Sequence, residues 1–142
     1  MFTPALASSP EARINDSRHT LLVPLLRLWR EIKPRKKMIA RFWTAITSQA
    51  QAPVYTDHLK THVLATLREV DGYVGARLLE RETDGGVEIV VITFWRSLDS
   101  IRKFAGDDIE RAVVSDEIVP LLLYYDQRVR HYDVVVEDDV NG

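Results

Sequence analysis

The pattern of hydrophobic and polar residues along the chain predicts four strands. Each candidate segment is rich in β-branched and aromatic residues, which favour extended structure. The four segments are residues 38–47, 73–83, 87–95 and 128–137. The sequence DGG at 84–86 predicts a tight hairpin turn between the second and third of them. The middle of the chain is therefore expected to form a β-hairpin.

Two helices are predicted between these strands. The first runs from Pro53 to about Val70 and carries an apolar stripe at helical spacing. The stripe consists of Val54, Leu59, Val63, Leu64, Leu67 and Val70. Gly72 supplies the left-handed position that commonly follows a helix. Ser97 is expected to cap the second helix, LDSIRKFA, which Gly106 ends.

The order of these elements predicts the fold class. Strand, helix, strand, strand, helix, strand is the split βαβ order of an α+β, ferredoxin-like domain with an antiparallel sheet. This domain is expected to occupy residues 38–142. Short helical pieces are also expected over 107–114 and 116–126, around Pro120.

The third strand is apolar on both of its faces. Its apolar residues are Val87, Ile89, Val91 and Trp95 on one face and Val90, Ile92 and Phe94 on the other. A strand of this kind is covered on both sides, whereas two helices cover only one face of the sheet. A second copy of the same sheet is the simplest cover. The pattern therefore predicts a homodimer that joins through sheet faces.

Residues 1–37 form an N-terminal extension of different composition. Their small and polar residues favour a partly disordered leader, and translation of the domain could also start at Met38. The alternative is a short amphipathic helix over 18–32 that docks on the domain, on a partner or on an anionic membrane surface.

Composition narrows the classes of function. Of 142 residues, 46% are hydrophobic and 28% charged, as in a globular domain, and the formal net charge is -2. This charge gives no electrostatic footprint for nucleic acid. The chain has no cysteine, which excludes disulfides and thiolate metal sites and suits the cytoplasm. No apolar run is long enough for a membrane span.

Five residues are candidates for a site. Trp43 and Trp95 lie near strand ends and are either core residues or a flat wall for a planar ligand. His58 and His62 stand four apart on the first helix and share a face. No third ligand joins them, so we expect a cleft-facing polar stripe and no metal. His131 is a candidate proton acceptor or an interface histidine.

Three segments together resemble a known family. These are MIARFW at the start of the domain, ITFWRSLDSIRKFAGDDIERAVV in its middle and VRHYDVVVE near its end. They are similar to the antibiotic biosynthesis monooxygenase (ABM) family of dimeric α/β barrels over residues 38–137. The resemblance implies a homodimer and, in some members, cofactor-free oxidation of aromatic phenols.

The resemblance also implies site residues. Family enzymes of the quinone-forming type use an asparagine, a tryptophan and an arginine, of which only the tryptophan carries over clearly, as Trp95. Haem-degrading members use an asparagine on strand one and a histidine on the second helix, and this chain has neither. Trp95 as aromatic wall and His131 as proton acceptor are thus the predicted catalytic residues.

Two functions remain open at this point. The first is a cofactor-independent monooxygenase acting on a planar aromatic or phenolic compound, with Trp43, His58 and His62 as substrate-binding residues. The second is a non-catalytic dimeric protein that binds a small ligand or is associated with stress. A haem-handling role ranks third.

Overall fold

The computed structural model describes residues 37–140. The prediction of a leader or a short amphipathic helix before Met38 concerns a segment that lies, apart from Lys37, outside the described residues. In the described part, no helix is long and apolar enough to cross a membrane.

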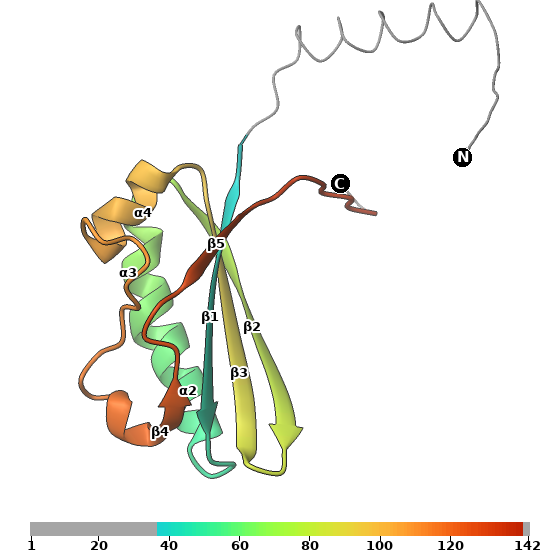
Figure 1. The fold of residues 1–142 in the computed structure, drawn as a ribbon, viewed down its shortest axis with the longest axis vertical. Helices are drawn as coiled ribbons and strands as arrows, with labels where there is room; N and C mark the ends of the chain where they lie inside the picture. Colours follow the sequence, from blue (N-terminus) through green and yellow to red (C-terminus); the bar gives the residue numbers. More distant parts are fainter. Residues whose placement is uncertain (1–36, 141–142) are drawn as a thin grey trace, which may run out of the picture. The chain divides into compact units, whose positions relative to one another are not determined.

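A single antiparallel sheet forms the centre of the domain (Figure 1). Its strands are β1 (Ile39–Thr47), β2 (Tyr73–Thr83), β3 (Gly86–Trp95), β4 (Leu122–Tyr125) and β5 (Arg130–Asp133). The strand order is β2-β3-β1-β4, and β5 also pairs with β1. The two C-terminal strands share one edge of β1: β5 pairs with its first half and β4 with its second half. Strand β1 is therefore paired along both edges.

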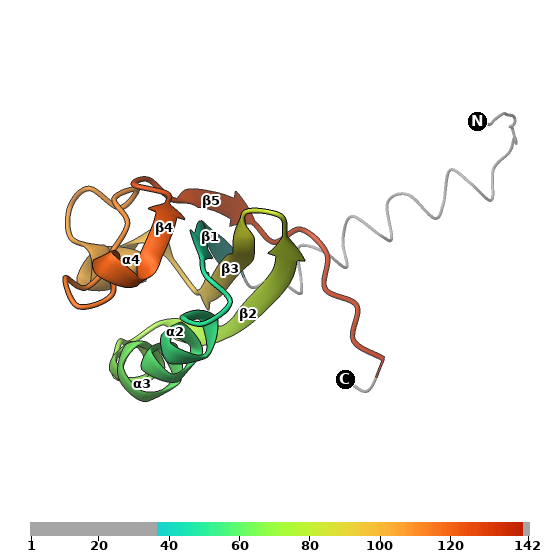
Figure 2. The same cartoon turned by 90° about the horizontal axis from the view of Figure 1, so that it is seen from below.

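The helices lie on one face of this sheet, as Figure 2 shows. The first helix is continuous but has three parts: α2 (Ala52–His58), a π-helical turn η1 (Leu59–Val63) and α3 (Leu64–Arg68). The second helix is α4 (Leu98–Ala105), and a short 3-10 turn, η2 (Val119–Leu121), precedes β4. The predicted α+β class with a ferredoxin-like βαββαβ core is confirmed, with β4 as an additional strand.

The hydrophobic core lies between the sheet and the helices and has two parts. One part surrounds Tyr55, Leu59 and Ile89, and the other surrounds Leu67 and Trp95. The odd-numbered residues of β3 point into this core and are buried, while its even-numbered residues are only half-buried. Among the described residues, no helix covers the second face, so its apolar side chains are left open to solvent or to a partner.

The caps predicted from the sequence are present. The Ser97 hydroxyl accepts a hydrogen bond from the backbone N–H of Ser100, at 3.1 Å, and so satisfies one free donor at the start of α4. Gly72 has φ +96°, and a Cβ there would lie 1.8 Å from the Ser100 hydroxyl. Glycine is thus required between α3 and β2 for conformation and for space. Gly106, at φ +89°, follows α4.

Several boundaries differ from the predictions. Residues 107–114 form no helix but a turn and an isolated bridge between Arg111 and Arg128. Within 116–126 only η2 is helical; residues 116–118 form a turn and residues 122–125 form the strand β4. The last strand is four residues long rather than ten. Val54, assigned to the apolar stripe, is 49% exposed, and Tyr55 takes the buried position instead.

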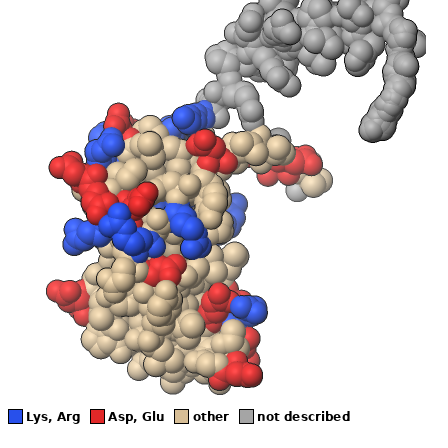
Figure 3. All heavy atoms as spheres, in the orientation of Figure 1, with Lys and Arg blue, Asp and Glu red and all other residues tan. Residues whose placement is uncertain are grey.

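Charged side chains of both signs are mixed on the face that Figure 3 shows. Arg128, for example, forms ion pairs with Asp108 and Glu110 on the surface. The lower part of the same view, where Figure 1 places β4, carries few charges. Two side chains of β4, Leu123 and Tyr124, are exposed. This face therefore presents no broad field of one sign.

Candidate functional site

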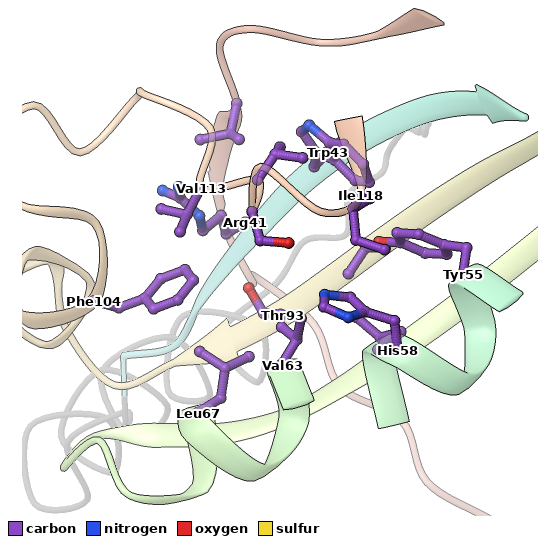
Figure 4. A pocket seen from close by; sticks show the side chains of 15 residues that line it. Arg41, Trp43, Tyr55, His58, Val63, Leu67, Thr93, Phe104, Val113 and Ile118 are labelled. Atoms are coloured by element: carbon purple, nitrogen blue, oxygen red, sulfur yellow. The ribbon is translucent and has the colours of Figure 1, made fainter. Parts of the chain in front are cut away.

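A pocket of about 70 Å³ lies between the sheet and the first helix (Figure 4). Strands β1 and β3 form its floor, the helix from α2 to α3 forms one wall, and α4 and the segment 113–118 close it. Most of its lining is aliphatic. Three aromatic side chains add flat surfaces, from Trp43, Tyr55 and Phe104. This is the general build of a small-molecule site, although it is small beside the roughly 300–1,000 Å³ of pockets for drug-sized ligands.

The mouth of the pocket lies at the segment after the isolated bridge. Val113 is 51% exposed and Ser115 is exposed, whereas Ile118, further along the same wall, is buried. His58 on the facing helix is half-buried. These side chains border the pocket between this segment and the helix.

Arg41 places a buried positive charge in the lining. It comes from the core-facing side of β1 and is 5% exposed. Its guanidinium donates to the carbonyl oxygen of Ile109 and, at 2.9 Å, to that of Arg111. Within residues 37–140 it forms no ion pair with a carboxylate. Burial lowers the pKa of Arg41 to about 10, which leaves it charged at neutral pH.

The guanidinium also fixes the state of His131. One of its nitrogens lies 2.9 Å from Nε2 of His131. Because arginine only donates, Nε2 is the acceptor and the ring proton is on Nδ1. Burial, together with the charge of Arg41, lowers the pKa of His131, so its ring is neutral at neutral pH. The lone pair that a general base needs is already used by Arg41.

Trp95 is in the core and does not line the pocket. It is 0% exposed, and its indole N–H donates to the hydroxyl of Thr93 at 2.8 Å. Its ring stacks on Phe104 at a centroid distance of 5.8 Å and meets Tyr73 edge-on at 5.5 Å. Phe104 and Thr93 are the residues that reach the pocket from this side. In this structure Phe104, and not the predicted Trp95, presents its ring to the pocket.

Trp43 is the tryptophan that lines the pocket. Its indole N–H donates to the backbone oxygen of Asp126 at 2.9 Å, which anchors the ring beside β4. Its ring stacks on Tyr55 at 6.1 Å with an interplanar angle of 28°. The two rings together form one flat end of the pocket (Figure 4).

Of the two histidines on the first helix, only His58 lines the pocket. Their rings stack at 5.1 Å with an interplanar angle of 17°. His58 lines the pocket, whereas His62 is exposed, and its Nδ1 lies 2.8 Å from the hydroxyl of Thr61. No group of three or more potential metal ligands occurs in the described part of the chain.

Tyr55, Arg41, Thr93 and Phe104 are pocket residues that the sequence analysis did not select. Two of them were readable in the sequence. Arg41 is a charged residue at a core-facing position of an otherwise apolar strand, between Ile39 and Trp43. Tyr55 stands four residues before Leu59 on the helix stripe. The other two required the tertiary structure.

The sheet, the helices on one of its faces and the pocket between them define a ferredoxin-like α+β protein. The chain belongs to the antibiotic biosynthesis monooxygenase family, whose model matches residues 38–114. This confirms the resemblance seen in the sequence. No curated protein matches the chain.

Solved structures of the same fold are similar to this chain at low identity. A Bacillus cereus protein described as an antibiotic biosynthesis monooxygenase is 14% identical, with a TM-score of 0.51 over 72% of this chain and 98% of its own. Rv0793 from Mycobacterium tuberculosis is 18% identical, with a TM-score of 0.46 and the same coverage. The monooxygenase ActVA-Orf6 of Streptomyces coelicolor, in complex with nanaomycin D, is 17% identical, with a TM-score of 0.48 over 77% of this chain and 95% of its own. At such identity the first of these likenesses bears on the fold alone.

Proposed function

We propose that the protein is a cofactor-independent monooxygenase that acts on a small planar phenol. The observation that carries the proposal is the buried charge of Arg41 in a pocket lined mostly by apolar and aromatic side chains. A cation without a carboxylate partner favours an anionic ligand, and a phenolate combines a flat ring with a negative charge. In such a reaction the substrate anion itself supplies the electrons that oxygen accepts.

The size of the pocket limits the substrate. Benzene occupies an engineered cavity of about 150 Å³ in another protein, and the present cavity measures about 70 Å³. By this comparison a single ring fits only if part of it stays outside the cavity at the mouth or the walls move. A fused-ring phenol would extend past Val113 and Ser115.

Oxygen uptake tests the proposal directly. The purified full-length chain is incubated with single-ring dihydroxybenzenes and with anthrone-like phenols in chelator-treated buffer, and uptake is followed with an electrode. We expect uptake that saturates with phenol concentration. Val114→Trp, which fills the pocket from its half-buried rim, should abolish it. Val54→Phe, an exposed change on α2, should not. Equal uptake by wild type and Val114→Trp would refute the proposal.

A second candidate is a non-catalytic protein that binds a small ligand. It is favoured by the small cavity and by the positions of Trp95 and His131, which are both held by other side chains. The same experiment separates the two: saturable binding of a phenol without oxygen uptake supports this second function. A haem-handling role fits least, because a cavity of about 70 Å³ does not enclose a porphyrin. An unchanged Soret band on titration with haemin would dismiss it.

The proposal includes a homodimer in the cytoplasm. On the open face of the sheet, Phe42, Val90, Ile92 and Phe94 are half-buried, and Tyr132 packs edge-on against Phe42 at 5.2 Å. A contiguous apolar face of this kind favours a partner of the same shape, and the lack of cysteine suits a reducing compartment. We expect wild type to sediment as a dimer and Ile92→Lys as a monomer. A wild type that is monomeric at micromolar concentration would contradict the dimer.

A further inference from the structure

The hydroxyl of Tyr55 is a buried polar group without a hydrogen-bond partner among residues 37–140. The residue is 5% exposed. Its ring is fixed between the core and Trp43, yet within residues 37–140 its hydroxyl forms no hydrogen bond. Buried tyrosine hydroxyls normally form a hydrogen bond, because burial removes their hydrogen bonds to water and an unpaired hydroxyl does not recover that loss. In Figure 4 this side chain points into the pocket, so its partner belongs there.

His58 brings a second unused polar group to the same place. It stands three residues after Tyr55 on α2, and residues at this spacing share a helix face. Its ring lines the pocket and stacks on His62, but no hydrogen bond to a described residue occupies either ring nitrogen. The π-helical turn begins at the next residue, Leu59. Such turns occur often at functional sites because they displace the helix locally.

The two groups are complementary in chemistry. Burial raises the pKa of Tyr55, so its hydroxyl keeps its proton and serves as a hydrogen-bond donor. An imidazole nitrogen that forms no other hydrogen bond can accept the proton of a hydroxyl. A donor and an acceptor on one helix face are what a hydroxyl needs in order to lose its proton and remain bound as an anion.

We propose that Tyr55 and His58 bind the reacting oxygen of the ligand, with His58 accepting its proton and the Tyr55 hydroxyl donating a hydrogen bond to it. The ligand is a phenol or an enol, and this assignment rests on the proposed function. In the step, the ligand O–H bond breaks, its proton moves to a ring nitrogen of His58, and the electron pair stays on the oxygen. The products are an imidazolium and a phenolate. The positive charge of Arg41, in the same pocket, favours the phenolate further.

The proposal assigns to His58 a role that neither His131 nor His62 can take in this structure. His131 has its Nε2 lone pair bound to Arg41, so it would have to break that contact to accept a proton. His62 faces solvent beside Thr61. The two histidines of the stacked pair are therefore expected to differ in function, which supplies a matched control.

A phenol that oxygen does not oxidise separates this proposal from the monooxygenase activity. We choose 4-nitrophenol, whose visible absorbance reports its ionisation, at a pH one unit below its pKa in solution. We expect binding to wild type to increase the phenolate absorbance. Tyr55→Phe should weaken binding of the phenolate by about tenfold or more, the usual effect of a lost hydrogen bond to a charged group. Tyr73→Phe, outside the pocket, should leave it unchanged.

The histidine variants test the proton transfer. His58→Gln retains a polar side chain but accepts no proton, so 4-nitrophenol should bind to it in the neutral form, without the absorbance increase. His62→Gln should behave as wild type. Circular dichroism establishes that each variant is folded. His58 is only half-buried, so His58→Gln should fold and test the proposal even if Tyr55→Phe does not fold.

Three results would overturn the proposal. These are no binding of 4-nitrophenol to wild type, unchanged affinity in folded Tyr55→Phe, or an undiminished absorbance increase in His58→Gln. The last two would show that pocket water, not a ligand, pairs with the two side chains. Binding with the expected shifts but no oxygen uptake with oxidisable phenols would leave this assignment standing and remove the monooxygenase.

Discussion

Replacement of Thr93 by valine tests whether the hydrogen bond between Trp95 and Thr93 stabilises the core. Valine matches threonine closely in shape and suits a strand, so the change removes little besides the hydroxyl. That hydroxyl is the acceptor for the indole N–H of Trp95, at 2.8 Å. Trp95 is 0% exposed and Thr93 is 7% exposed, so water does not readily replace the lost acceptor.

The expected loss follows from the unpaired N–H. Leaving one buried donor unsatisfied costs about 1–3 kcal/mol. With a urea dependence of about 1–3 kcal/mol per molar for a small domain, the unfolding midpoint should fall by about 1 M. Protein concentration is kept fixed, because association of protomers adds to apparent stability.

Trp95→Phe provides the control within the same contact. It removes the N–H itself, so Thr93→Val should cost less in the Trp95→Phe background than in wild type. A coupling of about 1 kcal/mol is expected from equilibrium unfolding followed by circular dichroism. If Thr93→Val shifts the free energy of unfolding by less than about 0.3 kcal/mol, or if the two changes are additive, the hydrogen bond does not hold Trp95 in place.

Three further changes probe the frame around the pocket. Ser97→Ala removes the cap of α4 and should lower the free energy of unfolding by about 1 kcal/mol. The melting temperature should then fall by roughly 4–8 °C, whereas Ser97→Asp, which retains a cap, should melt near wild type. Gly72→Ala forces a side chain into positive φ and against a hydroxyl 1.8 Å away, so it should lose more than about 1 kcal/mol, whereas Gly75→Ala, with open space around it, should not. Burial and the charge of Arg41 hold the pKa of His131 below its usual value in the folded protein. The unfolded chain therefore binds the proton more readily, so the free energy of unfolding should fall as the pH drops below about 6.5 towards the lowered pKa. His131→Gln should flatten this decline in urea titrations at a series of pH values, and an equally steep decline would contradict the assignment.

Local signals in the sequence were sufficient for most of the fold. The hairpin at 84–86, the Ser97 cap and the glycines after the helices depend on neighbouring residues only, and each is present. The strand β4 was assigned to a helix because a short apolar run does not distinguish the two structures. Its conformation is decided by pairing with β1, nearly 80 residues earlier, where Ala45 lies opposite Tyr125.

The site was less accessible from the sequence, for a physical reason. Trp95 was placed correctly at the end of β3, but its exposure depends on Phe104 and Tyr73, which pack on its two sides from other elements. Segment 107–114 carries helix-favouring residues, yet its carbonyl oxygens at Ile109 and Arg111 bind the guanidinium of Arg41 instead. Long-range contacts of single side chains thus decide which residues reach the pocket.

The π-helical turn at Leu59–Val63 has a consequence for engineering this protein. Each residue of an α-helix turns the chain by about 100°. A π turn contains one additional residue, and the α-helical parts before and after it still face the same direction. Tyr55 before the turn and Leu67 after it both face the sheet for this reason. Deletion of the exposed Lys60 would convert the turn to regular α-helix and keep both residues facing the sheet, because the turn holds the one residue that a regular helix does not need. A one-residue deletion in this turn should therefore be tolerated far better than a one-residue deletion within α2 or α3, which would rotate part of the helix away from the core.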